Sequence, residues 1–319
     1  MAVFVNTNYS ALQGQRYLGN VQNQLTTTYQ RLSSGMRINS AKDDAAGLQI
    51  ADRLTSQING LNQGNRNASD GIALAQTMEA GMDEISGMLQ KMRTLTVQAA
   101  NGTNTAEDRK ALGKEMESLA NEVTRIATKT TFAGKTILNG QIAGSIFGDP
   151  AQAGGNNPAG TTGTMTLQVG SNKGDTISFT SDSVIFSKLA TNTGLIANAD
   201  KMFTIAADGK ITVDMTKVDF SDATKDNYIG KAIELFDTMI ATVDGKRADL
   251  GALQNRLESS IRNQSNVAAN EADARSRIRD ADFAEESANL SQQSIIQQAA
   301  ASMLMQANTR PQLGLSLLG

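Results

Sequence analysis

The chain has 319 residues, enough for two or three domains, and its 29 basic and 32 acidic side chains leave a net charge of −3. It contains no histidine, cysteine or tryptophan. These absences exclude disulfides, thiolate nucleophiles, cysteine-based zinc sites and a Ser-His-Asp triad, and the balanced charge gives no basic surface for nucleic acid. We therefore expect a protein that is not an enzyme, with no catalytic residue, cofactor or metal, and with no nucleic-acid partner.

Apolar residues make up 39% of the chain and aromatic residues only 4%, which is little material for a compact core of this length. Long helices that bury narrow apolar seams suit such a composition better. No proline stops a helix within 1–149 or 159–310, because the three prolines are Pro150, Pro158 and Pro311. No apolar run reaches membrane-spanning length and the first residues lack a secretory signal pattern, so no membrane partner and no cleaved signal peptide are expected.

The first predicted helix carries a heptad-like seam. Leu18, Val21, Leu25 and Leu32 follow one another at spacings of three, four and seven residues, with Thr28 completing the stripe. Gly35 is well placed to end this helix, since glycine adopts the left-handed conformation that follows many helix C-termini. A second helix is expected soon afterwards, because Ser40 stands three residues before Asp43 as in a capping box.

The second predicted helix is exceptionally long. Its seam runs from Leu54 to Met92 at alternating spacings of four and three residues, with one polar member, Asn65. A helix of roughly 60 residues would be about 90 Å long and needs a coiled-coil or bundle partner. Thr105 and Asp108 predict a second capping box, which starts an antiparallel third helix with its seam between Leu112 and Ile126.

The middle of the chain changes character and predicts β-structure. Alternating apolar and polar residues predict one hairpin from 165–169 and 176–180, and a second from 203–205 and 211–213 around the Asp208-Gly209 turn. The sequence Gly134-Lys135-Thr136 looks like the end of a phosphate-binding loop. We reject a nucleotide site there because Lys129 occupies the position of the required leading glycine.

Helices are predicted again in the last third of the chain. A seam from Phe236 to Ile261 marks one helix, residues 279–282 form a charged joint, and Ile296, Ala300, Met303 and Ala307 mark a final helix that Pro311 is expected to stop. The predicted fold class is mainly α with a small β part. Long coiled-coil helices from both termini fold back on each other, an antiparallel helical bundle carries a β-hairpin, and a small β-rich domain lies outermost.

Three segments resemble signatures of one family. They are the run from Leu32 to Gly47 (LSSGMRINSAKDDAAG), the run from Ala274 to Phe283 (ARSRIRDADF), and the glutamine-rich end that reads QQA at 297–299 and QAN at 306–308, with Pro311-Gln312 and a final LSLL. All three are similar to bacterial flagellins in order and spacing. The resemblance covers roughly residues 1–140 and 227–319, whereas the middle is not diagnostic.

The resemblance implies a structural subunit that polymerises into the extracellular filament of the bacterial flagellum and leaves the cell through the flagellar type III apparatus. It implies a terminal coiled-coil domain (1–40 with 280–319), a helical-bundle domain with a β-hairpin (41–181 with 223–279) and a small variable outer domain (182–222), which we expect to share little core with the rest. The polymerisation seam would comprise Leu18, Val21, Leu25, Leu32, Ile296 and Met303. The alternative is a hook–filament junction protein of the same superfamily.

The same resemblance implies partners and surface sites. The partners are other copies of the chain, an export chaperone at the C-terminal region, hook-associated and cap proteins, and the vertebrate Toll-like receptor that senses flagellin. Residues 89–98 resemble the segment that this receptor binds, which carries the contacts over to Lys91, Leu95 and, on the next helix, Glu115. Thr191 and Thr193 are candidate sites of O-glycosylation.

Overall fold

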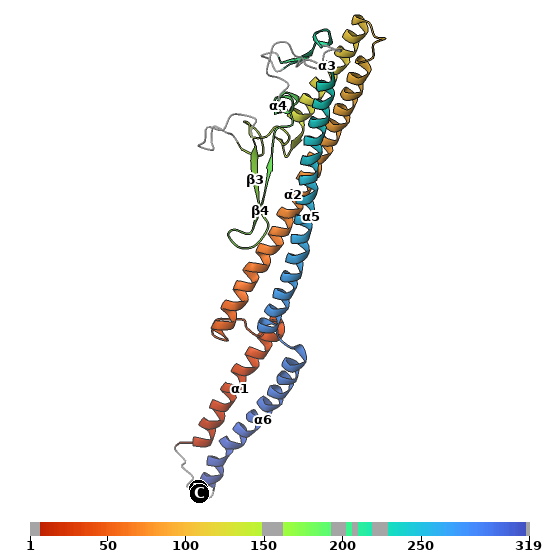
Figure 1. Ribbon diagram of the computed structural model, residues 1–319. Coiled ribbons are helices and arrows are strands. Elements are labelled where there is room, and N and C mark those ends of the chain that lie inside the picture. The colour runs from red at the N-terminus through yellow and green to blue at the C-terminus, as the bar shows by residue number, and fades with distance from the viewer. Residues whose placement is uncertain (1–6, 149–161, 193–201, 206–209, 219–228, 317–319) are drawn as a thin grey trace. The chain divides into compact units, whose positions relative to one another are not determined.

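The computed structural model describes residues 7–148, 162–192, 202–205, 210–218 and 229–316 (Figure 1). Within these ranges most residues are helical, as predicted. The helices are α1 (Tyr9–Ser34), α2 (Ala45–Ala99), α3 (Ala106–Lys129), α4 (Phe186–Asn192), α5 (Ile229–Arg279) and α6 (Phe283–Ser316), with one 3-10 turn, η1 (Met215–Lys217).

The strands of the described residues form three antiparallel pairs. These are β1 (Thr131–Phe132) with β2 (Lys135–Thr136), β3 (Gly163–Gln168) with β4 (Thr176–Ser181), and β5 (Phe203–Ile205) with β6 (Ile211–Val213). In the largest pair Met165 lies opposite Phe179 and Leu167 opposite Ile177, so apolar side chains share one face. Both predicted hairpins are confirmed. The Asp208-Gly209 turn of the second lies outside the described residues.

Contacts divide the chain into two compact units. Unit 1 comprises residues 1–59 and 266–319, and unit 2 comprises residues 60–265. Each unit therefore contains one part of α2 and one part of α5. The finer division into three domains stays a prediction.

In unit 2, α2 and α5 pair in opposite directions and α3 returns along α2 (Figure 1). Ion pairs and hydrogen bonds mark the edges of the α2–α5 contact: Arg93 binds Asp237 at 2.5 Å, and Gln254 donates to Glu79 at 2.9 Å. The seam between these edges is the predicted one. Its fully buried members include Met78, Met82, Ile85, Leu89, Met92 and Phe236. Leu74, which was not predicted, and Met116 of α3 are buried as well.

The two predicted capping boxes have different outcomes. At α3 the box is confirmed, since Thr105 Oγ1 accepts from the Asp108 N–H and Asp108 accepts from the Thr105 N–H. The Thr105 hydroxyl also donates to the Asp108 carboxylate at 2.7 Å, and this bond, followed by that of the Thr105 N–H, lowers the pKa of Asp108. At α2 the box is wrong. The helix begins at Ala45, and its cap is Asp44, which accepts from the Gly47 N–H at 2.9 Å.

A tight turn explains the segment that looks like a phosphate loop. Ala133 and Gly134 have φ angles of 49° and 79°, so both central residues of the β1–β2 turn are left-handed, as in a type I′ turn. Gly134 is therefore needed for the turn, and Lys135 and Thr136 form the second strand of a hairpin.

The last helix does not stop at the proline. The expectation that Pro311 ends it is wrong, because α6 continues to Ser316. Proline lacks an N–H, so the carbonyl of Ala307, one turn earlier, loses its bond within the helix. Asn8 supplies the replacement, donating from Nδ2 to the Ala307 oxygen at 2.8 Å.

The segment 182–222 contributes to the core of unit 2. Phe186, Phe203, Ile211 and Met215 are at most 3% exposed, and the Phe203 ring packs edge-on against Phe236 of α5 at 5.9 Å between centroids. The expectation that this segment shares little core is therefore wrong. Sequence reasoning missed this because the segment is rich in Thr and Asp, and its apolar residues form short runs such as Val184-Ile185-Phe186 rather than a long periodic seam.

The β3–β4 hairpin approaches α2 closely because α2 offers glycines there. A Cβ at Gly60 would lie 2.7 Å from the Ser171 Cβ, and one at Gly64 would overlap the Val169 carbonyl oxygen. Next to them, Asn67 donates to the Gln168 carbonyl at 2.9 Å. The absence of side chains at Gly60 and Gly64 therefore lets the hairpin lie directly against the helix, where Leu167 and Val169 join the buried core.

We predict that Gly64→Ala destabilises the chain by about 1–3 kcal/mol, because its methyl group forces the hairpin away from α2. The matched control is Gly87→Ala, where the same helix has nothing within 4 Å of the new methyl group. That change should stabilise the helix by about 0.5–1 kcal/mol. Urea titrations followed by circular dichroism measure the free energy of unfolding of both variants. Changes of the same sign in the two variants would contradict the role of Gly64.

Candidate polymerisation surface

The helices from the two ends of the chain, α1 and α6, pack along each other in opposite directions (Figure 1). Val21, Thr28 and Ala300 are buried at 4% exposure. The other predicted seam residues Leu18, Leu25, Leu32 and Ile296 are half-buried. Met303 is 72% exposed, and Leu304 instead takes that level of the interface, facing Gly14.

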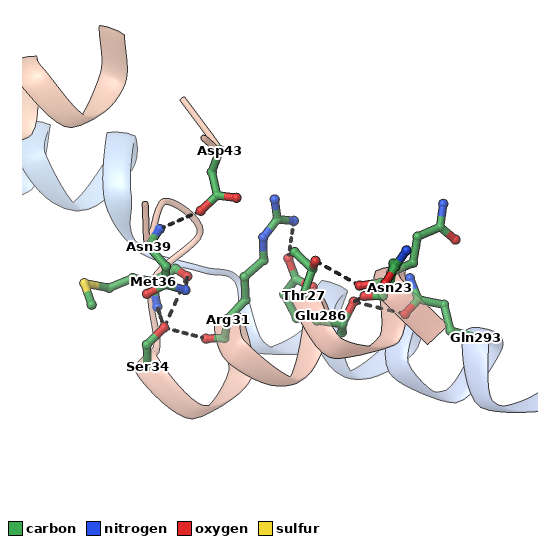
Figure 2. Close-up of polar contacts among 11 residues, drawn as sticks. Asn23, Thr27, Arg31, Ser34, Met36, Asn39, Asp43, Glu286 and Gln293 are labelled. Carbon is green, nitrogen blue, oxygen red and sulfur yellow. Dashed lines mark hydrogen bonds and ion pairs between the residues drawn. The ribbon is translucent and has the colours of Figure 1, made fainter. Parts of the chain in front are cut away.

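A polar layer crosses this interface near the C-terminal end of α1 (Figure 2). Arg31 Nη1 lies 3.1 Å from Glu286 Oε1, and the Glu286 side chain is only 9% exposed. One turn along, Thr28 donates from Oγ1 to Gln293 Oε1 at 3.1 Å. Because a buried carboxylate needs its cation, this layer disfavours alternative pairings of α1 with α6.

The two chain breaks of unit 1 are tied to each other. Gly35 ends α1 with φ 68°, and its carbonyl accepts from the Ala281 N–H at 3.0 Å. Arg37 donates from its backbone N–H to the Arg279 carbonyl at 2.7 Å and from Nη2 to the Ile278 carbonyl at 3.0 Å. The α1–α2 break and the α5–α6 break therefore form one hydrogen-bonded junction.

Asp43 orders the loop that leads from this junction into α2 (Figure 2). Its carboxylate accepts from the N–H groups of Ser40 and Asn39, at 2.9 and 3.1 Å, and from the Ser40 hydroxyl. These bonds, the Ser40 backbone bond foremost, lower the pKa of Asp43. The loop therefore keeps this support at neutral pH and loses it as pH falls through the lowered pKa.

Large apolar side chains remain exposed on the terminal pair. On α1 these are Tyr9, Leu12, Tyr17 and Tyr29, and on α6 they are Phe283, Ile295, Met303 and Met305, each between 53% and 74% exposed. A groove of about 470 Å³ lies between the two helices, lined by residues that include Gly14, Tyr17, Ala300 and Met303. Apolar surface gathered in this way is typical of an interaction site.

The predicted receptor contacts lie in unit 2. Lys91 of α2 and Glu115 of α3 form an ion pair at 3.2 Å and are 59% and 47% exposed. Leu95 belongs to the core and is 7% exposed. Two of the three residues thus form one accessible polar pair, and the third is buried in the core.

The candidate glycosylation sites are only partly described. Thr191 is exposed near the end of α4, and its hydroxyl donates to the Ser187 carbonyl at 2.6 Å. Thr193 lies outside the described residues.

Within the described ranges, no group of three or more Asp or Glu residues is arranged to hold a metal ion. In the same part of the chain, no helix is apolar over a stretch long enough to span a membrane. The features that stand out are long paired helices from both chain ends and an apolar surface on that pair. They define a helical protein built for association.

Comparison with known proteins gives the family. Residues 5–143 match the bacterial flagellin N-terminal helical region and residues 233–318 the bacterial flagellin C-terminal helical region. The chain is 38% identical to flagellin D of Vibrio anguillarum and 36% identical to flagellin A of Vibrio cholerae, each over the full length of both chains. The chain belongs to the bacterial flagellin family.

One solved structure shares the fold. The structure of a putative flagellar hook-associated protein from Vibrio parahaemolyticus matches with a TM-score of 0.54 at 17% identity, covering 75% of this chain and all of that one. The crystal structure of Bacillus cereus flagellin covers 64% of this chain at 27% identity, with a TM-score of 0.43.

We predict that Arg31→Met destabilises the α1–α6 pair by about 1–3 kcal/mol, because it leaves the Glu286 carboxylate without a cation. The cost is below that of a fully buried pair since the Arg31 side chain is 32% exposed. Hydrogen exchange of α1 amides in the full chain measures it. The double change Arg31→Met with Glu286→Leu should recover most of the loss, and a double variant no more protected than the single one would contradict this account.

Proposed function

We propose that the chain is the repeating subunit of an extracellular flagellar filament, and that the exposed apolar side chains of α1 and α6 form its contacts with other copies. The flagellin family polymerises into such filaments, and the chain is similar to flagellins along its whole length. The observation that carries the assignment of the contact surface is the gathering of eight large, exposed apolar side chains on the terminal pair. Burying them against a second copy would supply the apolar area that the pair lacks.

The alternative, a hook–filament junction protein, has less support. The hook-associated likeness is one of fold alone, at 17% identity, whereas the full-length relatives at 34–38% identity are flagellins. The remaining partners follow from the family resemblance. They are an export chaperone that binds the C-terminal region, hook-associated and cap proteins at the filament ends, and the flagellar type III apparatus as the route out of the cell.

Deleting residues 1–35 or 285–319 should abolish filament formation, since each deletion removes one helix of the pair. A point change tests the surface itself. Ile295 is 67% exposed, so Ile295→Lys should leave the helix content of the chain unchanged while preventing assembly. The matched control Ile295→Leu should assemble normally. Sedimentation and electron microscopy of seeded chains provide the readout, and normal filaments from Ile295→Lys would exclude this surface.

Recognition by the flagellin-sensing receptor is part of the same proposal. The accessible Lys91–Glu115 pair supports a polar contact there. An arginine at position 91 would keep the charge and add the planar fork that makes paired hydrogen bonds.

We therefore predict that Lys91→Arg activates the receptor more strongly than the unchanged chain, by about tenfold, the size of one good contact at a binding hot spot. Dose–response curves in receptor-bearing cells measure this difference. The ion pair with Glu115 stays available to arginine, so both chains should remain folded alike. Equal potency of the two chains would contradict the role given to the planar guanidinium group. Inactivity of both chains would exclude the receptor as a partner.

A further inference from the structure

One side chain joins the start of α1 to the far end of α6. Asn8 immediately precedes α1, and its Oδ1 accepts from the Ala11 N–H at 3.1 Å, which caps the helix. Its Nδ2 donates to the Ala307 carbonyl at 2.8 Å. A single amide group therefore satisfies a free donor of one helix and a free acceptor of the other.

Pro311 is the reason that Ala307 can accept this bond. In an α-helix each carbonyl accepts from the N–H four residues later, and the residue four after Ala307 has no N–H. Pro311 is the only proline within α1 or α6. The interior of α6 consequently offers Asn8 one carbonyl that no helical bond already occupies.

We propose that Asn8 and Pro311 together fix the register of α1 against α6. A slip of one helical turn, about 5.4 Å, would place Asn8 opposite a carbonyl already used by its own helix. The polar layer at Thr28 and Arg31 holds the other end of the interface, 20 residues or about 30 Å of helix away. The hydrogen bond from Asn8 to Ala307, which we call the pin, therefore fixes the end of the interface that this polar layer does not contact.

The register matters because both helices build the groove between them. Ser10, Gln13, Gly14 and Tyr17 form one wall, and Ala300, Met303, Gln306 and Ala307 form the other, so Ala307 belongs to the pin and to the groove. A slip would bring different side chains together on the surface that other copies would meet. This consequence rests on the proposed function, whereas the pin itself does not.

The absence of cysteine allows the register to be read from engineered disulfides. A Cβ at Gly14 would lie 3.9 Å from the Leu304 Cβ, within the range of about 3.5–4.5 Å that a disulfide needs. Gly14→Cys with Leu304→Cys therefore reports the observed register. Gly14→Cys with Ala300→Cys, or with Asn308→Cys, reports a slip of one turn in either direction.

Three backgrounds test the pin. Asn8→Ser and Asn8→Asp keep a capping oxygen but lose the amide N–H, and the aspartate has no donor at all. Pro311→Ala keeps Asn8 but supplies an N–H that competes for Ala307. Each should raise the yield of slipped crosslinks relative to the 14–304 crosslink by about fivefold, the effect of losing one hydrogen bond. Pro311→Ala distinguishes the pin from helix stability. Alanine favours a helix more than proline does, so an effect of helix stability alone would lower the share of slipped crosslinks, whereas loss of the pin raises it.

Crosslink yields are measured by mass spectrometry on the full chain, in the soluble and the sedimented fractions. The proposal is overturned if the 14–304 crosslink does not dominate in the otherwise unchanged chain. It is also overturned if Asn8→Asp leaves the proportions of the three crosslinks unchanged, or if Pro311→Ala lowers the share of slipped crosslinks. Failure of the chain to sediment as filaments counts against the proposed function only, since the soluble fraction still reports the register.

Discussion

Pairing between helices that are far apart in the sequence is the interaction on which both units depend. With few large apolar residues, no helix of this chain can bury enough surface alone, and each finds its partner in an antiparallel neighbour. In unit 2 the α2–α5 seam is closed by α3 and by core residues of the segment 182–222. In unit 1 the α1–α6 seam has no third layer among the described residues, which is why apolar side chains remain on its surface.

Most of the correct predictions came from the spacing of apolar and capping residues along the sequence. The helices, the Gly35 end, the capping box at Thr105 and both hairpins depend on residues within a few positions of each other, and local spacing expresses them. The start of α2 was misplaced because Asp43 and Asp44 are adjacent, and only the path of the loop decides that the second one caps the helix. A motif gives the kind of boundary but not its exact residue.

The features that were missed depend on partners distant in the sequence. Arg31 and Glu286 look like ordinary surface charges until α1 and α6 are paired. Pro311 looks like a stop signal until Asn8 is known to reach the carbonyl that it frees. Leu304 and Met303 differ by one position, and the small size of Gly14 on the opposite helix admits Leu304. Periodicity marks a face of a helix, but the facing residues decide which side chains of that face are buried.

The separation of α1 from α6 has a consequence for synthesis. The Thr28–Gln293 bond joins residues 265 positions apart, so unit 1 has no partner for its first helix until nearly the whole polypeptide has been translated. During translation α1 lacks the surface that it later packs against, and short helices without such a surface are marginal in water. During synthesis the residues of α1 therefore stay without this packing surface until those of α6 have been added.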